Sequence, residues 1–442
     1  MINGKRTAAL TPPMGWNSWD CYGASVTEKE LLENAEYMSH NLKKYGWEYV
    51  VCDIQWYEPD TDGSEYRDFV PLCMDEFSRL IPAENKFPSA AGGVGFRNIA
   101  DKIHGMGLKF GIHIMRGIPR QAVHQNTAIK GSFATARQIA QRFSVCSWNT
   151  DMYGVNPNAR GAQDYYDSVM ELYASWGVDF IKVDDICNTY FRPDDLYSAK
   201  EEIEMIRRAI DKTGREIVLS LSPGPADIAC AEHLKENANM WRITGDYWDR
   251  WEDLLDMFKR CEQWASHAQP GGWPDCDMLP LSHLAIRSHE CGLGERHTRF
   301  TKEEQKTMMT LWCICRSPLM FGGLLTDLDD WTFELITNEK VLRLLGHSYG
   351  AHQVSRTGYF DGNILWKSYD EDGSVYFALF NTYQKDFHVE YSLGQLGLED
   401  GVYEGEELWT GEKLDRIDKS LDAVVPVHGV KLYRIKMQPC SS

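Results

Sequence analysis

WGVDFIKVDD, residues Trp176–Asp185, holds the pattern that decides the fold of this chain. An amphipathic stretch leads into a short apolar run rich in β-branched residues, and this run ends in two aspartates. Similar runs recur along the chain with amphipathic segments between them, which is typical of parallel βα units. There are eight, the strand number of a (β/α)₈ barrel. We expect strands at 13–19, 49–54, 109–115, 179–184, 217–222, 240–246, 271–279 and 317–323.

The segments between these runs have apolar residues at three- and four-residue steps, which predicts helices. The clearest are 28–45, 97–106, 163–176, 197–213, 251–268 and 302–313. From about Gly346 the pattern changes to alternating strands, and DEDG at 370–373 separates two of them. We therefore predict an α/β chain: a (β/α)₈ TIM barrel over residues 1–345, followed by an antiparallel β-sandwich over residues 346–442.

One connection is much longer than barrels usually have. After the third predicted strand, Arg116–Asn158 runs for over forty residues before the next helix. Long loops in barrels lie at the catalytic face, so we expect this insertion to be a lid or a wall of the substrate pocket.

Composition narrows the choice of partner. Lys and Arg number 46 and Asp and Glu 65, so the formal net charge is −19. Such an acidic chain lacks the excess of basic residues that neutralises phosphates, so we expect no nucleic-acid partner. The 15 Trp and 21 Tyr exceed ordinary packing needs and suit sugar stacking. A neutral small substrate fits best.

The sequence shows no membrane or export signal. It has no run of about 18 apolar residues, so we expect no membrane span. The segment Met1–Pro13 lacks the hydrophobic region of a signal peptide, which favours the cytoplasm unless a signal has been removed. The 12 Cys are scattered, and free buried thiols fit them better than a disulfide framework. The oligomeric state stays open.

Carboxylates stand at the carboxyl ends of two predicted strands, where barrel enzymes place their chemistry. Side chains alternate along a strand, so Lys182 and Asp184 face the same way, and the cation would keep Asp184 ionised as a nucleophile. By the same alternation Arg242 and Asp246 share a face. We expect nearby aromatic residues to desolvate Asp246 and make it a general acid. Either aspartate alone could be a salt-bridge partner or a helix cap, but the pair is what glycoside hydrolysis needs.

Further polar and aromatic residues end other strands. Asp53 closes the second, Asp275 and Asp277 the seventh, and Trp16 and Trp19 lie on the first. Carboxylates that bind hydroxyl groups, together with an indole surface, make a monosaccharide subsite. Packing or capping explains any one of these residues, but not their agreement across several strands.

Taken together, these motifs resemble glycoside hydrolase family 27, the retaining α-galactosidases and α-N-acetylgalactosaminidases. The resemblance covers nearly the whole chain, through PPMGWNSW, ADKIHGMGLKFGI, WGVDFIKVDD, MWRITGD, WPDCDML and VPVHGVKLYRI. It implies removal of terminal α-D-galactosyl or galactose-like residues from a glycoside or oligosaccharide, through a covalent glycosyl-aspartate and without metal or cofactor. It places the nucleophile on Asp184, the acid/base on Asp246, and sugar binding on Trp19, Asp53, Lys182, Arg242 and Asp277.

Departures from the family pattern complete the predicted sugar-binding set. Where the family has two adjacent aspartates followed by Cys-Trp, this chain has Asp53, Ile54, Gln55 and Trp56. His113 replaces a tyrosine, and Ser222 replaces the glutamate of α-galactosidases. We expect Ile54, Trp56, His113 and Ser222 to contact the sugar. β-L-Arabinopyranosidase and α-N-acetylgalactosaminidase are therefore alternative activities.

Other classes of function are less well supported. A non-catalytic carbohydrate-binding barrel would keep the tryptophans but gives no reason for two carboxylates with same-face cations. The glycine-rich segments 90–96 and 321–323 suggest phosphate loops, but the first lacks a preceding strand and the P-loop lysine, and the second is weak. Residues His289, Glu290, Cys291, Glu295 and His297 are possible zinc ligands, but their spacing matches no zinc motif, so we expect a loop wall.

Overall fold

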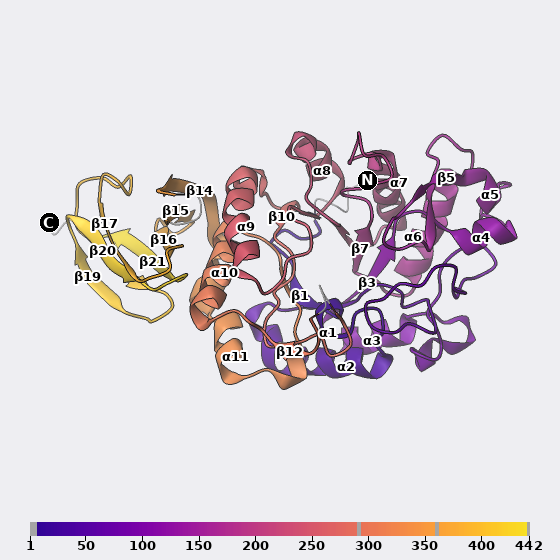
Figure 1. The fold of residues 1–442 in the computed structure, drawn as a ribbon, viewed down its shortest axis with the longest axis horizontal. Coiled ribbons are helices and arrows are strands. Elements are labelled where there is room, and N and C mark those ends of the chain that lie inside the picture. The colour runs from indigo at the N-terminus through magenta and orange to yellow at the C-terminus, as the bar shows by residue number, and fades with distance from the viewer. Residues whose placement is uncertain (1–6, 290–292, 359–361, 440–442) are drawn as a thin grey trace. The chain divides into compact units, whose positions relative to one another are not determined.

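The computed structural model describes residues 7–289, 293–358 and 362–439. Within them, eight parallel strands form one curled sheet in the order β10-β9-β8-β7-β3-β2-β1-β13. Figure 1 labels β1, β3, β7 and β10 of this sheet. A parallel bridge joins Leu279, just after β10, to Phe321 of β13, so the ends of the sheet meet as in a barrel. All eight predicted strands are present, and the predicted (β/α)₈ fold is confirmed. They are β1 (Met14–Asn17), β2 (Tyr49–Cys52), β3 (Lys109–Met115), β7 (Phe180–Asp184), β8 (Val218–Leu221), β9 (Met240–Arg242), β10 (Trp273–Asp275) and β13 (Leu319–Phe321).

Amphipathic helices follow the strands, as their apolar spacing predicts. The helix predicted over 28–45 changes geometry along its length: α2 (Glu28–Tyr37) continues as the π-helical η2 (Met38–Leu42) and the 3₁₀-helical η3 (Lys43–Tyr45). Its start is fixed by a capping box between Thr27 and Glu30. The other helices beside these strands are α1 (Trp19–Tyr22), η4 (Pro88–Gly93), α3 (Arg97–Gly105), α6 (Ala162–Ser175), α7 (Lys200–Thr213), η5 (Ile228–Cys230), α8 (Ala231–Asn237) and η7 (Leu325–Asp327).

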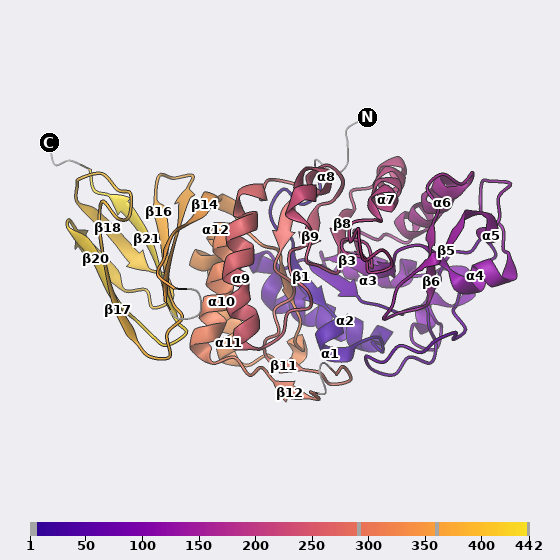
Figure 2. The same ribbon diagram turned by 45° about the horizontal axis from the view of Figure 1, so that its top comes forward.

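The long insertion after β3 has a fold of its own. It forms a small antiparallel sheet in the order β4-β6-β5 with two short helices (Figure 2). Its elements are β4 (Ile118–Pro119), α4 (Arg120–Gln125), α5 (Ala136–Ile139), β5 (Ala140–Val145) and β6 (Met152–Val155). A second small pair, β11 (His283–Leu284) with β12 (Arg296–His297), lies beside α1.

The core around the eight strands is rich in tryptophan. Trp16, Trp47, Trp56, Trp241 and Trp273 are all fully buried. Burying a large apolar side chain stabilises a fold by about 1.5–3 kcal/mol, so these indoles contribute much of the core's stability. Part of the aromatic content that the sequence associates with sugar stacking therefore serves packing.

The chain divides into two compact units. Unit 1 contains residues 1–246, 269–298 and 318–328, and unit 2 contains 247–268, 299–317 and 329–442. Unit 2 therefore combines several helices with the C-terminal strands. Its helices are α9 (Trp251–Trp264), η6 (Ala265–His267), α10 (Lys302–Cys315), α11 (Asp330–Ile336) and α12 (Glu339–His347). The single boundary predicted at residue 346 stays a prediction.

The C-terminal strands of unit 2 are antiparallel, as predicted. Six form a sheet in the order β14-β15-β16-β21-β18-β19, and β17 pairs with β20. Residues 370–373 form the turn between β15 and β16, and Leu365, Phe377 and Ile435 lie in the core beneath. The strands are β14 (Ser348–Arg356), β15 (Asn363–Asp370), β16 (Val375–Asn381), β17 (Phe387–Ser392), β18 (Tyr403–Glu407), β19 (Lys413–Ile417), β20 (Ser420–Val425) and β21 (Val430–Met437).

The cysteines and the helices of the described residues bear on two expectations, free thiols and no membrane span. The cysteines among them form no disulfide, as the sequence predicts. None of the helices in the described ranges is both long and apolar enough to cross a membrane.

Candidate active site

A histidine binds the aspartate that ends β7. His113 on β3 is fully buried, and its Nε2 lies 3.0 Å from Oδ2 of Asp184. The backbone N–H of Asp185 donates to Oδ1 at 3.1 Å. Burial alone would raise the pKa of Asp184, but the hydrogen bond from His113 and the charge of Lys182 outweigh it and hold this pKa well below its usual range. Asp184 is therefore ionised, as a nucleophile must be.

Lys182 pairs with Asp53 rather than directly with Asp184. Its Nζ lies 2.9 Å from Oδ2 of Asp53, which also accepts from Asn17 Nδ2 at 2.7 Å. The strand register explains this pair: His113 stands opposite Lys182, and Ile112 opposite Cys52, so Asp53 and Lys182 flank His113 at one level of the sheet. Alternation along the strand predicts the face of Lys182, but it does not predict that Asp53 is its partner.

Arg242 on β9 joins two further predicted residues. Its guanidinium lies 2.9 Å from Oδ1 of Asp246 and 2.7 Å from Oδ2 of Asp277. The Asp246 side chain is 64% exposed, so the desolvation that the sequence predicts for it is wrong in this structure. Asp246 follows the turn at Gly245, beyond the end of β9, and this places it at the rim. Asp275, also predicted, is buried and accepts the backbone N–H of Asp277 at 2.9 Å.

An aromatic wall stands beside these carboxylates. Trp19 stacks on Tyr66 with ring centroids 6.0 Å apart, and Tyr66 lies 5.5 Å from Trp148 of the long insertion. Burial raises the pKa of Tyr66, and the negative charges of Asp53 and Asp184 add to this effect. Tyr66 therefore lies within electrostatic range of both carboxylates. Trp148 therefore brings the insertion against Tyr66, and its role as a wall of the substrate pocket stays a prediction.

Sequence reasoning misses Tyr66, Trp148 and Asp20. The first two lie on long loops, where position in the sequence does not predict the direction of a side chain. The available signal was the presence of aromatic residues in loops at the catalytic end of the barrel. Asp20 is buried, and its Oδ2 has no hydrogen-bond partner among the described residues. Burial and the charge of Asp277 raise the pKa of Asp20 well above its usual range. This carboxyl can therefore be protonated and donate a hydrogen bond.

Three strand ends turn through an unusual backbone conformation. Gln55, Asp185 and Asp277 have φ values of 59°, 54° and 79°, a left-handed region that residues other than glycine seldom adopt. Such conformations concentrate at functional sites, because the surrounding structure has to hold them. They follow β2, β7 and β10, whose carboxyl ends carry the candidate residues.

The remaining predicted sugar-binding residues differ in their surroundings. Trp56 is fully buried, packs edge-on against Phe96 and Trp176, and donates to the His113 carbonyl oxygen at 2.7 Å. Trp56 therefore supports the backbone of His113, and its predicted sugar contact stays a prediction. Ile54 is 2% exposed, directly after Asp53. Ser222 is buried, and its hydroxyl has no partner among the described residues.

A buried arginine binds the residues at the end of β7. Arg116, the first residue of the insertion, donates to Oδ2 of Asp185 at 2.6 Å and to Oε1 of Glu202 at 2.9 Å. Its backbone N–H donates to the Asp184 carbonyl oxygen at 3.0 Å. The insertion, α7 and the end of β7 are therefore tied together at one guanidinium.

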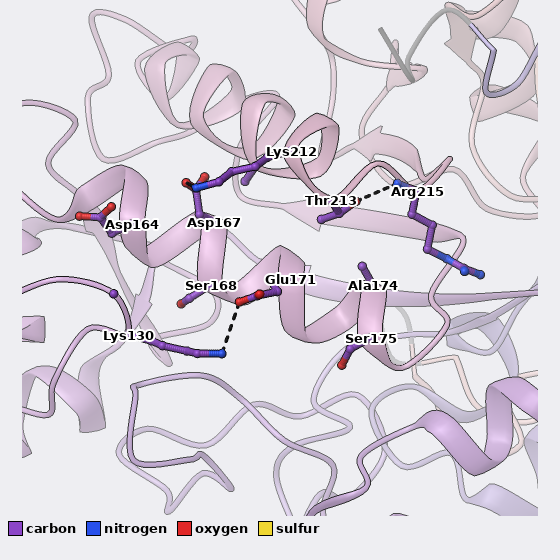
Figure 3. A pocket seen from close by; sticks show the side chains of 12 residues that line it. Lys130, Asp164, Asp167, Ser168, Glu171, Ala174, Ser175, Lys212, Thr213 and Arg215 are labelled. Atoms are coloured by element: carbon purple, nitrogen blue, oxygen red, sulfur yellow. Dashed lines mark hydrogen bonds and ion pairs between the residues drawn. The ribbon is translucent and has the colours of Figure 1, made fainter. Parts of the chain in front are cut away.

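A hollow of about 670 Å³ lies on the outer helices α6 and α7, away from the candidate residues at the strand ends (Figure 3). Its lining is charged, with ion pairs between Lys130 and Glu171 and between Lys212 and Asp167. None of its lining residues is aromatic, and it is not formed by strand ends. It does not resemble a sugar site.

Known proteins match the chain along its length. A family model described as alpha galactosidase A matches residues 155–345, and one described as the alpha galactosidase C-terminal beta sandwich domain matches residues 361–435. Alpha-galactosidase 2 of Arabidopsis thaliana is 27% identical over 432 residues, covering 97% of this chain and 90% of that protein.

Two solved structures are more similar. A GH27 β-L-arabinopyranosidase from Geobacillus stearothermophilus, in complex with arabinose, is 55% identical with a TM-score of 0.96, over 99% of this chain and 100% of the other. A Bacillus halodurans protein provisionally named an α-N-acetylgalactosaminidase is 51% identical with a TM-score of 0.87, over 97% and 98% of the two chains. The chain therefore belongs to glycoside hydrolase family 27 and is a glycosidase that acts on a carbohydrate substrate.

Proposed function

We propose that this chain is a retaining exo-glycosidase that removes terminal β-L-arabinopyranosyl residues and accepts α-D-galactosides less well. The observation that carries the choice of sugar is Ile54, a 2% exposed aliphatic residue directly after Asp53. β-L-Arabinopyranose is α-D-galactose without the hydroxymethyl group and needs fewer polar partners. The Geobacillus stearothermophilus β-L-arabinopyranosidase, at 55% identity, supports the same substrate.

The proposed reaction is a double displacement. Asp184 attacks the anomeric carbon, the bond from this carbon to the leaving oxygen breaks, and Asp246 gives its proton to that oxygen. Water then attacks the same carbon, Asp246 takes its proton, and Asp184 leaves as a carboxylate. We place this chemistry in a catalytic domain over residues 1–345, ahead of a β-sandwich over residues 346–442.

The surrounding residues hold the sugar. Asp53 and Lys182 form an ion pair with capacity to bind a hydroxyl group, and we assign them to the axial 4-hydroxyl that both sugars carry. Arg242 and Asp277 form a second pair, which we assign to the hydroxyl groups nearest the anomeric carbon. Trp19 provides an apolar surface for the sugar ring.

A panel of nitrophenyl glycosides tests the proposal: β-L-arabinopyranoside, α-D-galactoside and N-acetyl-α-D-galactosaminide. We expect the highest kcat/KM on the first. NMR should show the β-anomer of L-arabinopyranose released first, because retention preserves the configuration. Initial release of the α-anomer would contradict the double displacement. Binding of L-arabinose without turnover of any glycoside would favour a carbohydrate-binding barrel instead.

A further inference from the structure

Two histidines and two carboxylates converge outside the candidate active site. His283 on β11 stands directly opposite His297 on β12, so both side chains lie on one face of this strand pair. Their imidazoles stack with centroids 5.0 Å apart and planes 22° apart. Asp327 at the end of η7 places Oδ2 2.9 Å from Nδ1 of His283, and Glu295 places Oε1 2.8 Å from its Nε2.

We propose that His283, His297 and Asp327 form a zinc site, with Glu295 orienting His283. One donor atom from each of the three residues lies within 4.8 Å of the others. Zinc bonds of about 2.0–2.2 Å put tetrahedral donors roughly 3.3 Å apart, so small side-chain rotations suffice. His297 and Asp327 are exposed and can make them. The proposal is independent of the glycosidase reaction.

The donor chemistry selects the class of metal. Two imidazoles with one carboxylate suit zinc and similar transition metals, whereas calcium and magnesium prefer oxygen donors. Nδ1 of His283 would bind the ion while Nε2–H donates to Glu295, the carboxylate–histidine–zinc arrangement of many zinc sites. The imidazole of His297 makes no hydrogen bond to any described residue, so it can turn a nitrogen toward the ion.

The backbone around the site is already held in place. The His283 carbonyl oxygen accepts from Leu324 N–H at 2.9 Å, and the Ser282 carbonyl oxygen accepts from Thr298 N–H at 2.8 Å. These bonds fix both strands relative to the segment that ends at Asp327. A bound ion would therefore join the loop after β10 to the loop after β13, two loops at the carboxyl ends of barrel strands.

The cluster differs from the possible ligands that sequence spacing suggests. Glu295 and His297 belong to both sets, but His289 is not part of the cluster. Glu290 and Cys291 lie outside the described residues. Sequence spacing misses His283 and Asp327, because β11 pairs with β12 across the loop and Asp327 arrives from beyond α10.

The opposing explanation is a plain ion bridge, in which protonated His283 donates to both Asp327 and Glu295. Metal binding separates the two explanations. Protein without an affinity tag is treated with EDTA, dialysed, and titrated with ZnCl₂ by calorimetry. Co²⁺ is added to a second sample to record the visible absorption of tetrahedral cobalt. We expect one zinc ion per chain, a cobalt spectrum, and a Tm that rises with zinc concentration because the ion binds the folded state.

Variants locate the site. We expect His297→Ala and Asp327→Asn each to weaken zinc binding by about 100-fold or more, and Glu295→Gln by about 10–100-fold. His289→Ala, which removes an exposed histidine of the same loop, should bind like the native chain. Circular dichroism confirms that each variant is folded. Absence of zinc binding, or equal binding by His297→Ala, Asp327→Asn and the native chain, would overturn the proposal.

Discussion

His113 and Asp184 form a buried hydrogen bond of 3.0 Å between neighbouring strands, β3 and β7. Asp184 accepts as a carboxylate, so Nε2 of His113 carries the proton. Nδ1 of His113 has no hydrogen-bond partner among the described residues. The pair thus holds Asp184 in its ionised form.

This bond predicts the pH dependence of activity. The pKa of Asp184 is lowered, mainly by His113 acting against burial, so activity should be lost only as pH falls through this lowered value. In His113→Phe the carboxyl loses its donor, so the acidic limb of kcat/KM should move to higher pH. At neutral pH, kcat/KM should fall about tenfold or more, because a hydrogen bond to a charged group contributes about 1.5–3 kcal/mol.

Two variants serve as controls for this experiment. His113→Tyr keeps a donor and should restore most of the acidic limb. His104→Phe removes a similar pair, in which His104 Nε2 lies 2.7 Å from Asp179 just before β7 begins, and should leave the limb unchanged. Equal limbs in the native chain and His113→Phe would show that His113 does not control Asp184.

Asp184, the proposed nucleophile, gives a second prediction. Asp184→Ala should lower kcat by about 10⁴-fold or more while the fold persists, since no other group can form the covalent intermediate. Azide should restore some activity and give a glycosyl azide of inverted configuration, visible by NMR. Asp185→Asn should retain turnover, because its side chain binds Arg116 rather than the sugar. Loss of turnover in Asp185→Asn but not in Asp184→Ala would reverse the assignment.

Arg116 gives a prediction about stability. Arg116→Met leaves Asp185 and Glu202 buried without their shared cation, which should cost about 3–5 kcal/mol in the free energy of unfolding. Lys130→Met, in the same insertion, breaks the exposed ion pair with Glu171 of α6 and should cost about 0–1 kcal/mol. Urea unfolding of both variants measures the difference. Similar costs would mean that the Arg116 network does not hold the insertion.

How well the sequence predicts a feature depends on how far apart in the chain the interacting residues lie. Strand positions and the shared face of Lys182 and Asp184 depend on neighbours in the chain, so apolar runs and alternation predict them. The ion pair of Lys182 with Asp53 depends on the register of β2, β3 and β7, which no local pattern contains. Position along a strand also does not reveal how exposed a side chain is, so the expectation that Asp246 is desolvated was wrong.

Ile54 is the residue through which the choice of sugar can be tested. Relatives in the family pattern have a second hydroxyl-binding aspartate at this position, and a buried hydroxyl without a partner costs about 1–3 kcal/mol. Ile54→Asp supplies an acceptor that the hydroxymethyl group of galactose can use. It also puts a second negative charge beside Asp53. The smaller sugar has no hydroxymethyl group to bind this charge, so its binding should weaken.

We therefore expect the native chain to prefer the β-L-arabinopyranoside over the α-D-galactoside by tens- to hundreds-fold at most, the usual effect of one pocket contact. Ile54→Asp should move the ratio of the two kcat/KM values toward galactose by about tenfold or more. Ile54→Val keeps an aliphatic side chain and should keep the native ratio, which separates the charge from a general disturbance. Both ratios come from initial rates on the two nitrophenyl glycosides. An unchanged ratio in Ile54→Asp would show that Ile54 does not touch the sugar, and specificity would then reside in the aromatic wall that Tyr66 and Trp148 build from the loops.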